Sequence, residues 1–390
     1  MAQIPSHTPF WRDIRFIRVL LQILFLLGVL LLAGILYTNM QRGLRNLNLE
    51  LNLDFLSNEA GFYISEGIGY DPSNAYQKAF WVGILNTIKV SLIGIVCATV
   101  LGLFFGIARL SSNWLIRNIA TAYVEVFRNI PLLLQILFWY TAVIIGQLPQ
   151  VHDSISLPGS IYINNRGIYL PALEPTPGLK IWLIFICIGI LIGGVLFVLQ
   201  WRKLQRLDRP GFPAKWALPV FIIVAICGWF LTPENPFKLN LPELGRFNYQ
   251  GGFRFSSEFS ALLIGLSVYT GAYIAEIVRS GLQAVAKGQR EAAGAVGLNQ
   301  RQTLRLIVLP QAIPIIVPPL TSQYLNLAKN SSLAVAIGFP DVFSIGNTMM
   351  SHTGQSIPVF AMIMVSYLIM SLTTSAAMNW YNKWINRMKK

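Results

Sequence analysis

Apolar stretches long enough to cross a lipid bilayer dominate this chain, beginning with a largely apolar run at residues 16–36. An α-helix rises about 1.5 Å per residue, so about 20 apolar residues cross a hydrocarbon core of roughly 30 Å. The first run lacks a small-residue cleavage site and is long for a signal peptide, so we expect a retained span. The predicted spans are residues 16–36, 82–107, 119–145, 181–199, 216–231, 259–280, 312–327 and 359–380. The sequence therefore predicts an all-α polytopic membrane protein with about eight transmembrane helices.

The composition agrees with this class and excludes several others. Hydrophobic residues make up 54% of the chain and charged residues only 12%, whereas soluble domains average about 25% charged residues. Glycines such as Gly102 and Gly106 recur at four-residue spacing, which is typical of helices in close contact within lipid. The sequence contains no Walker A, zinc-protease or nucleophile-elbow pattern. It therefore predicts a protein that is not an enzyme and has no metal site and no cofactor of its own.

Basic residues are concentrated in alternate connecting segments. The chain has 30 Lys and Arg against 16 Asp and Glu, a net charge of +14. The basic segments are residues 12–18, 109–117, 202–215, 279–305 and 383–390, which contain few acidic residues. Because cytoplasmic loops are enriched in Lys and Arg, both termini are predicted to be cytoplasmic, which requires an even number of spans. This orientation explains the positive charge without a nucleic-acid partner.

One cytoplasmic loop, residues 283–311, is both long and patterned. Small and charged residues favour a short helix over residues 287–296, and Gly297 follows where a left-handed backbone is needed to end it. Asn299 and Gln302 have the spacing of a capping box, which starts a second, amphipathic helix. The loop is therefore predicted to form a helix–glycine–helix elbow on the cytoplasmic surface.

The elbow also matches a known motif. Glu291-Ala292-Ala293 is followed after three residues by Gly297, and after nine more by Ile307, Leu309 and Pro310. This spacing resembles the EAA motif of membrane subunits of ABC importers without a gap. The resemblance implies that the short helix docks into a cleft on a separate ATPase subunit. The implied coupling residues are Glu291, Ala292, Ala293, Gly297, Ile307, Leu309 and Pro310. An ordinary amphipathic loop helix is the alternative.

Segments outside this loop resemble the permeases of polar amino-acid importers. They include YVEVFRNIPLLLQ at 123–135, YIAEIVR at 273–279 and LAKNSSL at 327–333. The resemblance implies a five-helix core of the type I ABC importer permease fold, and the first span and the long insert resemble the larger general L-amino acid permeases. The predicted divisions are a tail, first helix and extracytoplasmic segment at 1–80, the first part of the core at 81–146, an insert with two extra transmembrane helices at 147–258, and the second part of the core at 259–390 with the EAA loop at 283–311.

This resemblance implies a function and a set of partners. The chain would be the permease subunit of an ATP-driven amino-acid uptake transporter in the bacterial inner membrane. Its implied partners are an ABC ATPase subunit that binds the ATP, a periplasmic or lipid-anchored substrate-binding protein, and a second permease subunit. We favour a heterodimer, and a homodimer remains open. The alternative function is an ion-gradient-driven secondary transporter, which would have inverted repeats and broken helices near the membrane midplane and would need no ATPase.

Polar residues within the predicted spans are candidates for the substrate path, because charges at membrane depth are costly. The candidates are Glu125, Arg128, Glu276, Gln323, Asn326, Lys329, Asn330, Ser331 and Ser332. An amino acid needs donors for its carboxylate, such as Lys329 or Arg128, and an acceptor for its ammonium group, such as Glu125 or Glu276. Local ion pairs between residues three apart on one helix, and hydrogen bonds between helices, are the alternatives.

Overall fold

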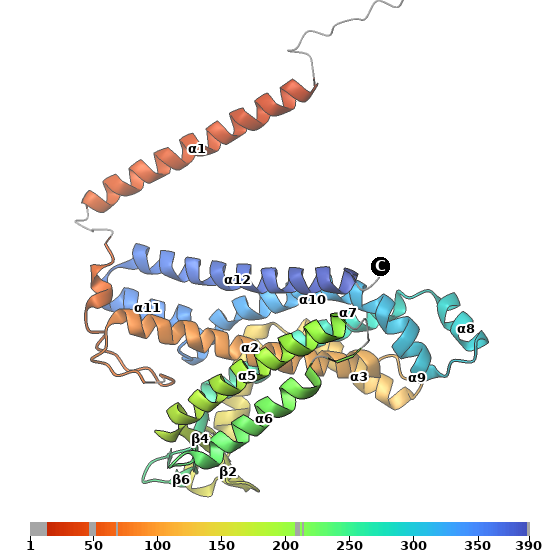
Figure 1. Ribbon diagram of the computed structural model, residues 1–390. Helices are drawn as coiled ribbons and strands as arrows, with labels where there is room; N and C mark the ends of the chain where they lie inside the picture. The colour runs from red at the N-terminus through yellow and green to blue at the C-terminus, as the bar shows by residue number, and fades with distance from the viewer. Residues whose placement is uncertain (1–13, 47–51, 68, 207–210, 213, 388–390) are drawn as a thin grey trace, which may run out of the picture.

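The computed structural model describes residues 14–46, 52–67, 69–206, 211–212 and 214–387 (Figure 1). Most of the predicted N-terminal tail and the basic residues Arg209, Lys389 and Lys390 lie outside the described residues. Long helices make up most of the rest of the chain. They are α1 (Ile14–Asn46), α2 (Tyr76–Ala108), α3 (Trp114–Asn129), α5 (Gly178–Arg206), α6 (Ala214–Leu231), α7 (Ser257–Gln283), α10 (Leu309–Asn330) and α12 (Ser356–Arg387).

The predicted number of spans is confirmed. Within the described residues, seven helices are long and apolar enough to cross a membrane, and a bent helix pair brings the number to eight. The five spans of the predicted core are α2, the bent pair, α7, α10 and α12, and the two extra helices of the insert are α5 and α6. Three prolines, Pro314, Pro318 and Pro319, lie inside α10, which nonetheless continues from end to end.

The third predicted span, residues 119–145, is wrong as a single helix. The chain bends by 106° between α3 and α4 (Leu132–Leu137), which continues as the π-helical η3 (Phe138–Ile145). Pro131 has no N–H to donate and pushes Ile130 into an extended conformation, with φ −94° and ψ 129°. The Gln135 amide donates to the carbonyl oxygens of Phe127 and Ile130, 2.8 and 3.0 Å away, so the break is satisfied internally.

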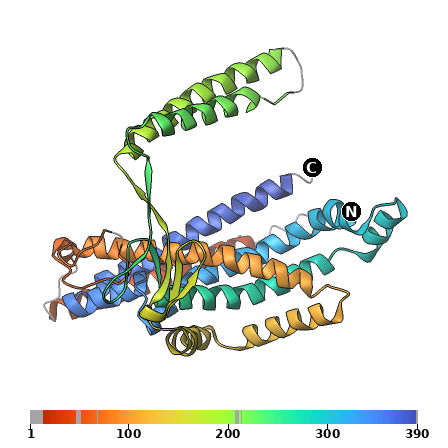
Figure 2. The same cartoon turned by 90° about the horizontal axis from the view of Figure 1, so that it is seen from below.

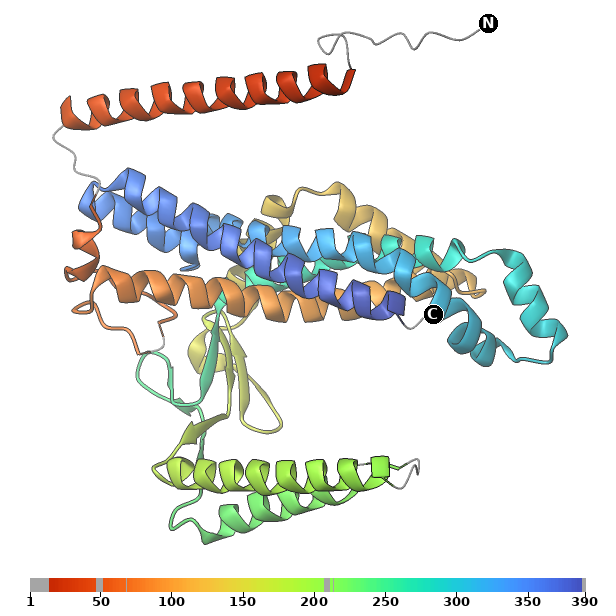
Figure 3. The same ribbon diagram turned by 45° about the horizontal axis from the view of Figure 1, so that its top comes forward.

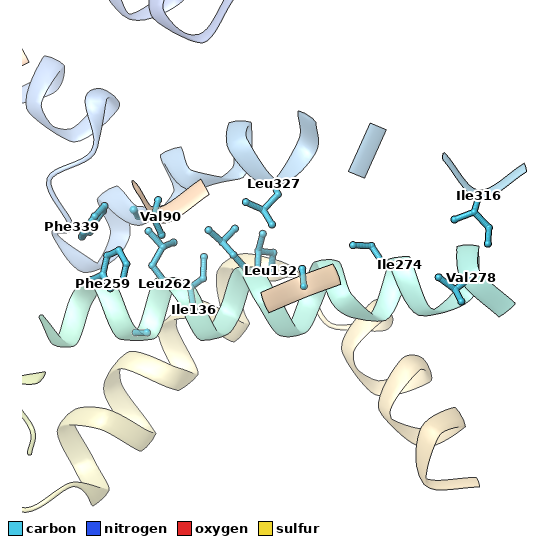
Figure 4. Close-up of a cluster of buried hydrophobic side chains, with 14 of the residues drawn as sticks. Val90, Leu132, Ile136, Phe259, Leu262, Ile274, Val278, Ile316, Leu327 and Phe339 are labelled. Atoms are coloured by element: carbon cyan, nitrogen blue, oxygen red, sulfur yellow. The ribbon is translucent and has the colours of Figure 1, made fainter. Parts of the chain in front are cut away.

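The centre of the molecule is the long contact between α2 and α7, with α10 packed against both (Figure 4). Val90 of α2, Leu262 and Ile274 of α7 and Leu327 of α10 are fully buried there. The predicted close approach of two helices at a glycine is confirmed at Gly102 of α2, where a Cβ atom would lie 2.4 Å from the side chain of Ile274 of α7. Small residues therefore let the two backbones approach closely.

The insert contains short strands that the sequence did not predict. The strands β1 (Ile155–Leu157), β2 (Ile161–Asn164), β3 (Gly167–Leu170) and β8 (Phe253–Ser256) form an antiparallel sheet in the order β1-β2-β3-β8. Two further pairs are β4 (Ala172–Pro175) with β5 (Phe237–Asn240), and β6 (Glu243–Leu244) with β7 (Tyr249–Gln250). These strands connect the helical bundle to the α5–α6 hairpin, which stands apart from it (Figure 2). The hairpin and α1 lie on opposite sides of the bundle (Figure 3).

The remaining helices are short. They are η2 (Asp54–Ser57), η4 (Val151–Asp153), α8 (Lys287–Ala295), α9 (Gln300–Thr303), the π-helical η5 (Leu304–Val308), η6 (Ser331–Ile337) and α11 (Val342–Thr353). Of these, α8 and α9 project from one end of the bundle, whereas α11 lies near the other end (Figure 1). The elbow loop is therefore separated from the strand-rich insert along the long axis of the molecule.

Candidate functional site

The predicted elbow is formed as expected. Helix α8 ends at Ala295 with Val296 as its C-cap, and Gly297 has a left-handed backbone with φ +84°. The capping box is present: the Asn299 N–H donates to Gln302 Oε1 at 3.0 Å, and the Gln302 N–H donates to Asn299 Oδ1 at 2.9 Å. From Gln300 the chain runs through α9 and η5 into α10 without a loop. The second arm of the elbow is thus continuous with a membrane-spanning helix.

The surface of α8 is available to a partner. Within this helix only Ala293 is buried, while Glu291 and Ala292 are exposed and Val296 beside them is 76% exposed. Glu291 makes a 3.5 Å pair with Lys287 one turn earlier, but both side chains remain in solvent. Of the other predicted coupling residues, Leu309 packs partly against the core next to buried Val308, whereas Gly297 and Pro310 are exposed. The elbow therefore presents one small exposed helix on a fixed base.

A cavity of about 320 Å³ lies between α7 and α10. It is lined by Tyr269, Thr270, Tyr273, Gln323, Asn326 and Asn330. Tyr269 and Tyr273 of α7 share one face, as do Gln323, Asn326 and Asn330 of α10, because they are spaced by three or four positions; Thr270 lies beside Tyr269. None of the lining side chains carries a charge at neutral pH. The cavity therefore offers hydroxyl and amide groups that can both donate and accept hydrogen bonds.

The structure brings together only part of the predicted substrate path. Gln323, Asn326 and Asn330 line the cavity. The hydroxyl groups of Ser331 and Ser332 instead donate to backbone carbonyls three residues earlier, each at 2.9 Å. Lys329 is exposed and does not line the cavity. The tyrosines of α7 were not predicted, although Tyr269 and Tyr273 have the i, i+4 spacing of one helical face.

Arg128 lies against the ring of Tyr273, one of the residues that line the cavity. Its guanidinium carbon lies 5.0 Å from the centre of the Tyr273 ring, at a distance typical of a cation–π contact. The Arg128 Nε atom is buried without a hydrogen-bond partner among the described residues. Its predicted pairing with Glu125 is not formed, because Glu125 lies 4.0 Å from Arg109 instead. Arg128 is thus in contact with one residue of the cavity lining.

Glu276 belongs to an ion-pair cluster outside the cavity. Its carboxylate accepts hydrogen bonds from Arg109 at the end of α2 and from Arg279 one turn later on α7. The predicted pair of Glu276 with Arg279 is therefore present, and a long-range partner is added to it. The cluster fastens α2 to α7 beside the base of the elbow, where Arg290 also donates to the Leu282 carbonyl at 2.7 Å. Glu276 thus connects helices in the structure, and its candidacy for the substrate path stays a prediction.

A second ion pair involves the N-terminal half of α2. Lys89 Nζ lies 3.0 Å from Glu66 Oε2, and the two side chains are 24% and 9% exposed. The Lys89 ammonium also lies 4.5 to 5.5 Å from the ring centres of Phe259, Phe253 and Phe255. Glu66 Oε1 accepts from the Ser256 N–H at 3.0 Å. The pair therefore joins the segment before α2, α2 itself and the start of α7.

We expect single substitutions at this pair to lower stability more than removal of both charges. Lys89→Met leaves the Glu66 carboxylate without its cation, and Glu66→Gln leaves the Lys89 ammonium with only the rings, so either loss is costly. The double variant removes both charges. Its change in the free energy of unfolding should differ from the sum of the two single changes by about 0.5–3 kcal/mol. Thermal unfolding of the purified protein in detergent measures this cycle. Lys78→Met, at an exposed position of the same helix, is the control, and additive effects at Lys89 and Glu66 would contradict the coupling.

Comparison with known proteins agrees with the helical membrane architecture. Residues 185–388 match the family model described as "Binding-protein-dependent transport system inner membrane component". The chain is 42% identical to the general L-amino acid transport system permease protein AapQ of Rhizobium johnstonii, over 92% of this chain and 90% of that protein. It is also 42% identical to the putative amino-acid ABC transporter permease protein YhdX of Escherichia coli, over 93% of each chain. The protein BztB of Rhodobacter capsulatus, a glutamate/glutamine/aspartate/asparagine transport system permease, is 37% identical over 94% of this chain and 92% of its own.

These matches cover nearly the whole chain, including the insert. The family model begins within α5 and continues to the end of α12, so it includes the elbow and both helices of the cavity. The predicted resemblance is thus confirmed. The chain belongs to the family of binding-protein-dependent transport system inner membrane components, together with the permease subunits of ABC transporters.

Proposed function

We propose that this chain is one half of the translocation pore of an ATP-driven importer of amino acids. A separate ATPase subunit would bind the ATP, so that the chain itself carries no cofactor and catalyses no reaction. A substrate-binding protein would deliver the amino acid on the extracytoplasmic side, and a second, related permease would complete the pore as a heterodimer. Both termini would be cytoplasmic, in line with the basic segments of the sequence.

One observation carries this proposal: the elbow joins the two helices that line the polar cavity. Helix α7 ends at Gln283, α8 follows, and α9 and η5 lead directly into α10. A force applied to α8 therefore reaches both walls of the cavity. The chain would thereby couple ATP-driven movement of a partner to a change in the shape of the cavity.

The cavity suits an amino acid in size and chemistry. Its volume of about 320 Å³ falls within the range of small-molecule sites. The hydroxyl and amide groups can donate to a carboxylate and accept from an ammonium group, and Arg128 lies behind Tyr273 as a nearby positive charge. The names of the relatives support the same substrate class, since they describe transport of L-amino acids or of glutamate, glutamine, aspartate and asparagine.

Uptake into proteoliposomes tests the function directly. The permease pair is reconstituted with its ATPase and binding protein, and uptake of a panel of radiolabelled amino acids is measured with internal or external ATP. We expect uptake only when ATP is present on the side of the ATPase. The bend at Pro131 is a broken helix of the kind that secondary transporters also contain, so an ion gradient is tested as well. Uptake driven by Na⁺ or H⁺ without the ATPase would contradict the proposal.

Substitutions in the cavity should weaken transport of the substrate selectively. Asn326→Leu replaces an amide that lines the cavity with an apolar side chain, so a polar group of the substrate loses a hydrogen-bond partner and we expect KM to rise about tenfold or more. ATP hydrolysis in the absence of substrate should stay within about twofold of the wild type, because the elbow is unchanged. Ser332→Ala, which alters a neighbouring hydroxyl that donates to the backbone, is the matched control. Equal KM values for the two variants would contradict a substrate site in this cavity.

A further inference from the structure

The insert contains a second cavity, of about 360 Å³, far along the chain from the elbow. Its lining includes Gln150, His152, Asn165, Arg166, Arg246 and Phe247. These residues come from three separate places: the loop after η3, the turn between β2 and β3, and the turn between β6 and β7. None of them lines the cavity between α7 and α10. The insert therefore has a pocket of its own.

The turns that form this pocket are held in place by hydrogen bonds within the insert. The buried Tyr169 of β3 donates its hydroxyl to the Asn248 side chain, which fixes the β6–β7 turn against the sheet. Burial raises the pKa of Tyr169, so its phenol remains protonated as the donor. Arg254 donates to the Arg166 carbonyl at 2.9 Å, which fixes the β2–β3 turn. The pocket is therefore a feature of the folded insert.

The pocket carries positive charge without a matching carboxylate. Among the described residues, neither Arg166 nor Arg246 has a carboxylate within 4.0 Å, whereas Lys89, Arg109 and Arg279 are all paired. The neighbouring acids in the sequence, Asp153 and Glu243, pair with neither arginine. Two exposed guanidinium groups that face one pocket favour a carboxylate, which they can bind with paired hydrogen bonds.

The rim of the pocket has the composition of a protein interface. Phe247 lies at the turn between β6 and β7, and its side chain is 72% exposed. The Arg246 guanidinium carbon lies 5.3 Å from the centre of the Phe247 ring. Aromatic residues and arginine are enriched in protein interfaces, where they contribute much of the binding energy. An exposed ring beside two unpaired arginines thus favours a protein partner over a free small molecule.

The position of the pocket indicates which partner can reach it. The strand β6 and the projecting helices α8 and α9 lie toward opposite ends of the molecule (Figure 1). With the elbow on the cytoplasmic side, the strands of the insert face the extracytoplasmic side. The family is named for its dependence on a binding protein, which must meet the permease on that side.

We propose that this pocket is a docking site for acidic side chains of the soluble substrate-binding protein. Arg166 and Arg246 bind the carboxylates, and Phe247 packs against the apolar surface beside them. This inference rests on the proposed function, because it assigns one partner of the importer to one place on the insert. It also gives the strands of the insert a role that the transport path itself does not require.

The affinity of the binding protein for the assembled transporter tests this site. The transporter is placed in nanodiscs, and binding is measured by biolayer interferometry at low and at high NaCl concentration. Arg166→Glu with Arg246→Glu should lower the affinity by about tenfold or more and reduce its dependence on salt. Lys180→Glu with Lys238→Glu, which reverses two exposed charges of the insert outside the pocket, is the matched control and should bind within about twofold of the wild type.

Each outcome separates the two proposals. No binding by the wild-type transporter would contradict the proposed function. Binding by the wild type with unchanged affinity in the arginine double variant would overturn only the docking site, provided that size-exclusion chromatography shows both variants assembled. If the double variant instead loses binding of free L-glutamate while it keeps its affinity for the binding protein, the pocket is a small-molecule site and the docking proposal is wrong.

Discussion

Replacement of Glu291 by Lys together with Gly297 by Val should abolish ATP-driven uptake while the chain still inserts and assembles. Reversal of an interfacial charge weakens association by about 2–5 kcal/mol. A residue that replaces Gly297 must adopt a backbone φ of +84°. This conformation costs a non-glycine residue about 1–2 kcal/mol, and more if the residue is β-branched. Together these free-energy costs correspond to a decrease in ATP-driven uptake of about 100-fold or more. The core should remain intact, because both positions are exposed.

Gly294 offers a matched control for the backbone effect. A Cβ atom at Gly294 or at Gly297 would contact nothing within 4 Å, and only Gly297 has a positive φ. Gly294→Val should therefore retain most of the uptake, whereas Gly297→Val alone should lose it. Uptake and co-purification of the ATPase with a tagged permease are measured for each variant. Normal uptake in the Glu291/Gly297 double variant, with confirmed expression, would refute the coupling role of the elbow.

Replacement of Glu276 by Arg should also cause a large loss of uptake, by separating α2 from α7. Glu276 is the carboxylate that lies between Arg109 and Arg279. The variant places three guanidinium groups together in a partly buried cluster, and loss of a paired charge in such a place costs about 3–5 kcal/mol. We expect at least about a 100-fold loss of uptake together with a lower yield of assembled transporter.

Glu125 provides the control for this charge change. It is the other carboxylate near Arg109, but it lies 4.0 Å away and its side chain is 60% exposed. Exposed ion pairs contribute at most about 1 kcal/mol, so Glu125→Arg should keep most of the activity. Assembly is followed by size-exclusion chromatography and uptake in proteoliposomes. Similar losses in the two variants would show that the cluster is not the cause.

The local features of the elbow could be predicted from the sequence, because their determinants are a few residues apart. The capping box of Asn299 and Gln302 needs only three-residue spacing, and the turn at Gly297 depends on a single residue. The number of spans follows from hydropathy in the same way. The break at Pro131 was missed because residues 119–145 are apolar enough on average to cross a membrane as one helix, although the proline that causes it is visible in the sequence.

Long-range contacts could not be predicted. The partners Arg109 and Glu276 are 167 residues apart, and only the fold brings α2 and α7 together. The candidate site was predicted in part for the same reason: Gln323, Asn326 and Asn330 form one face of α10, but the opposing tyrosines depend on how α7 packs. The strands of the insert are two to four residues long, which is too short for a recognisable alternation of polar and apolar residues.

During translation, the insert delays synthesis of the second part of the core relative to the first part. Helix α2 ends at Ala108 and α7 begins at Ser257, so about 150 residues are translated between them. At about 5–20 residues per second, α2 resides in the membrane for roughly 7–30 seconds before its main partner emerges from the ribosome. During that interval Asn86 and Thr87 lack the backbone groups of Pro340 and Val342 to which they later hydrogen-bond. Lys89 can already pair with Glu66 but lacks the aromatic rings near the start of α7. Because of this delay, we expect insertases or chaperones to bind α2 and shield its polar groups during biogenesis.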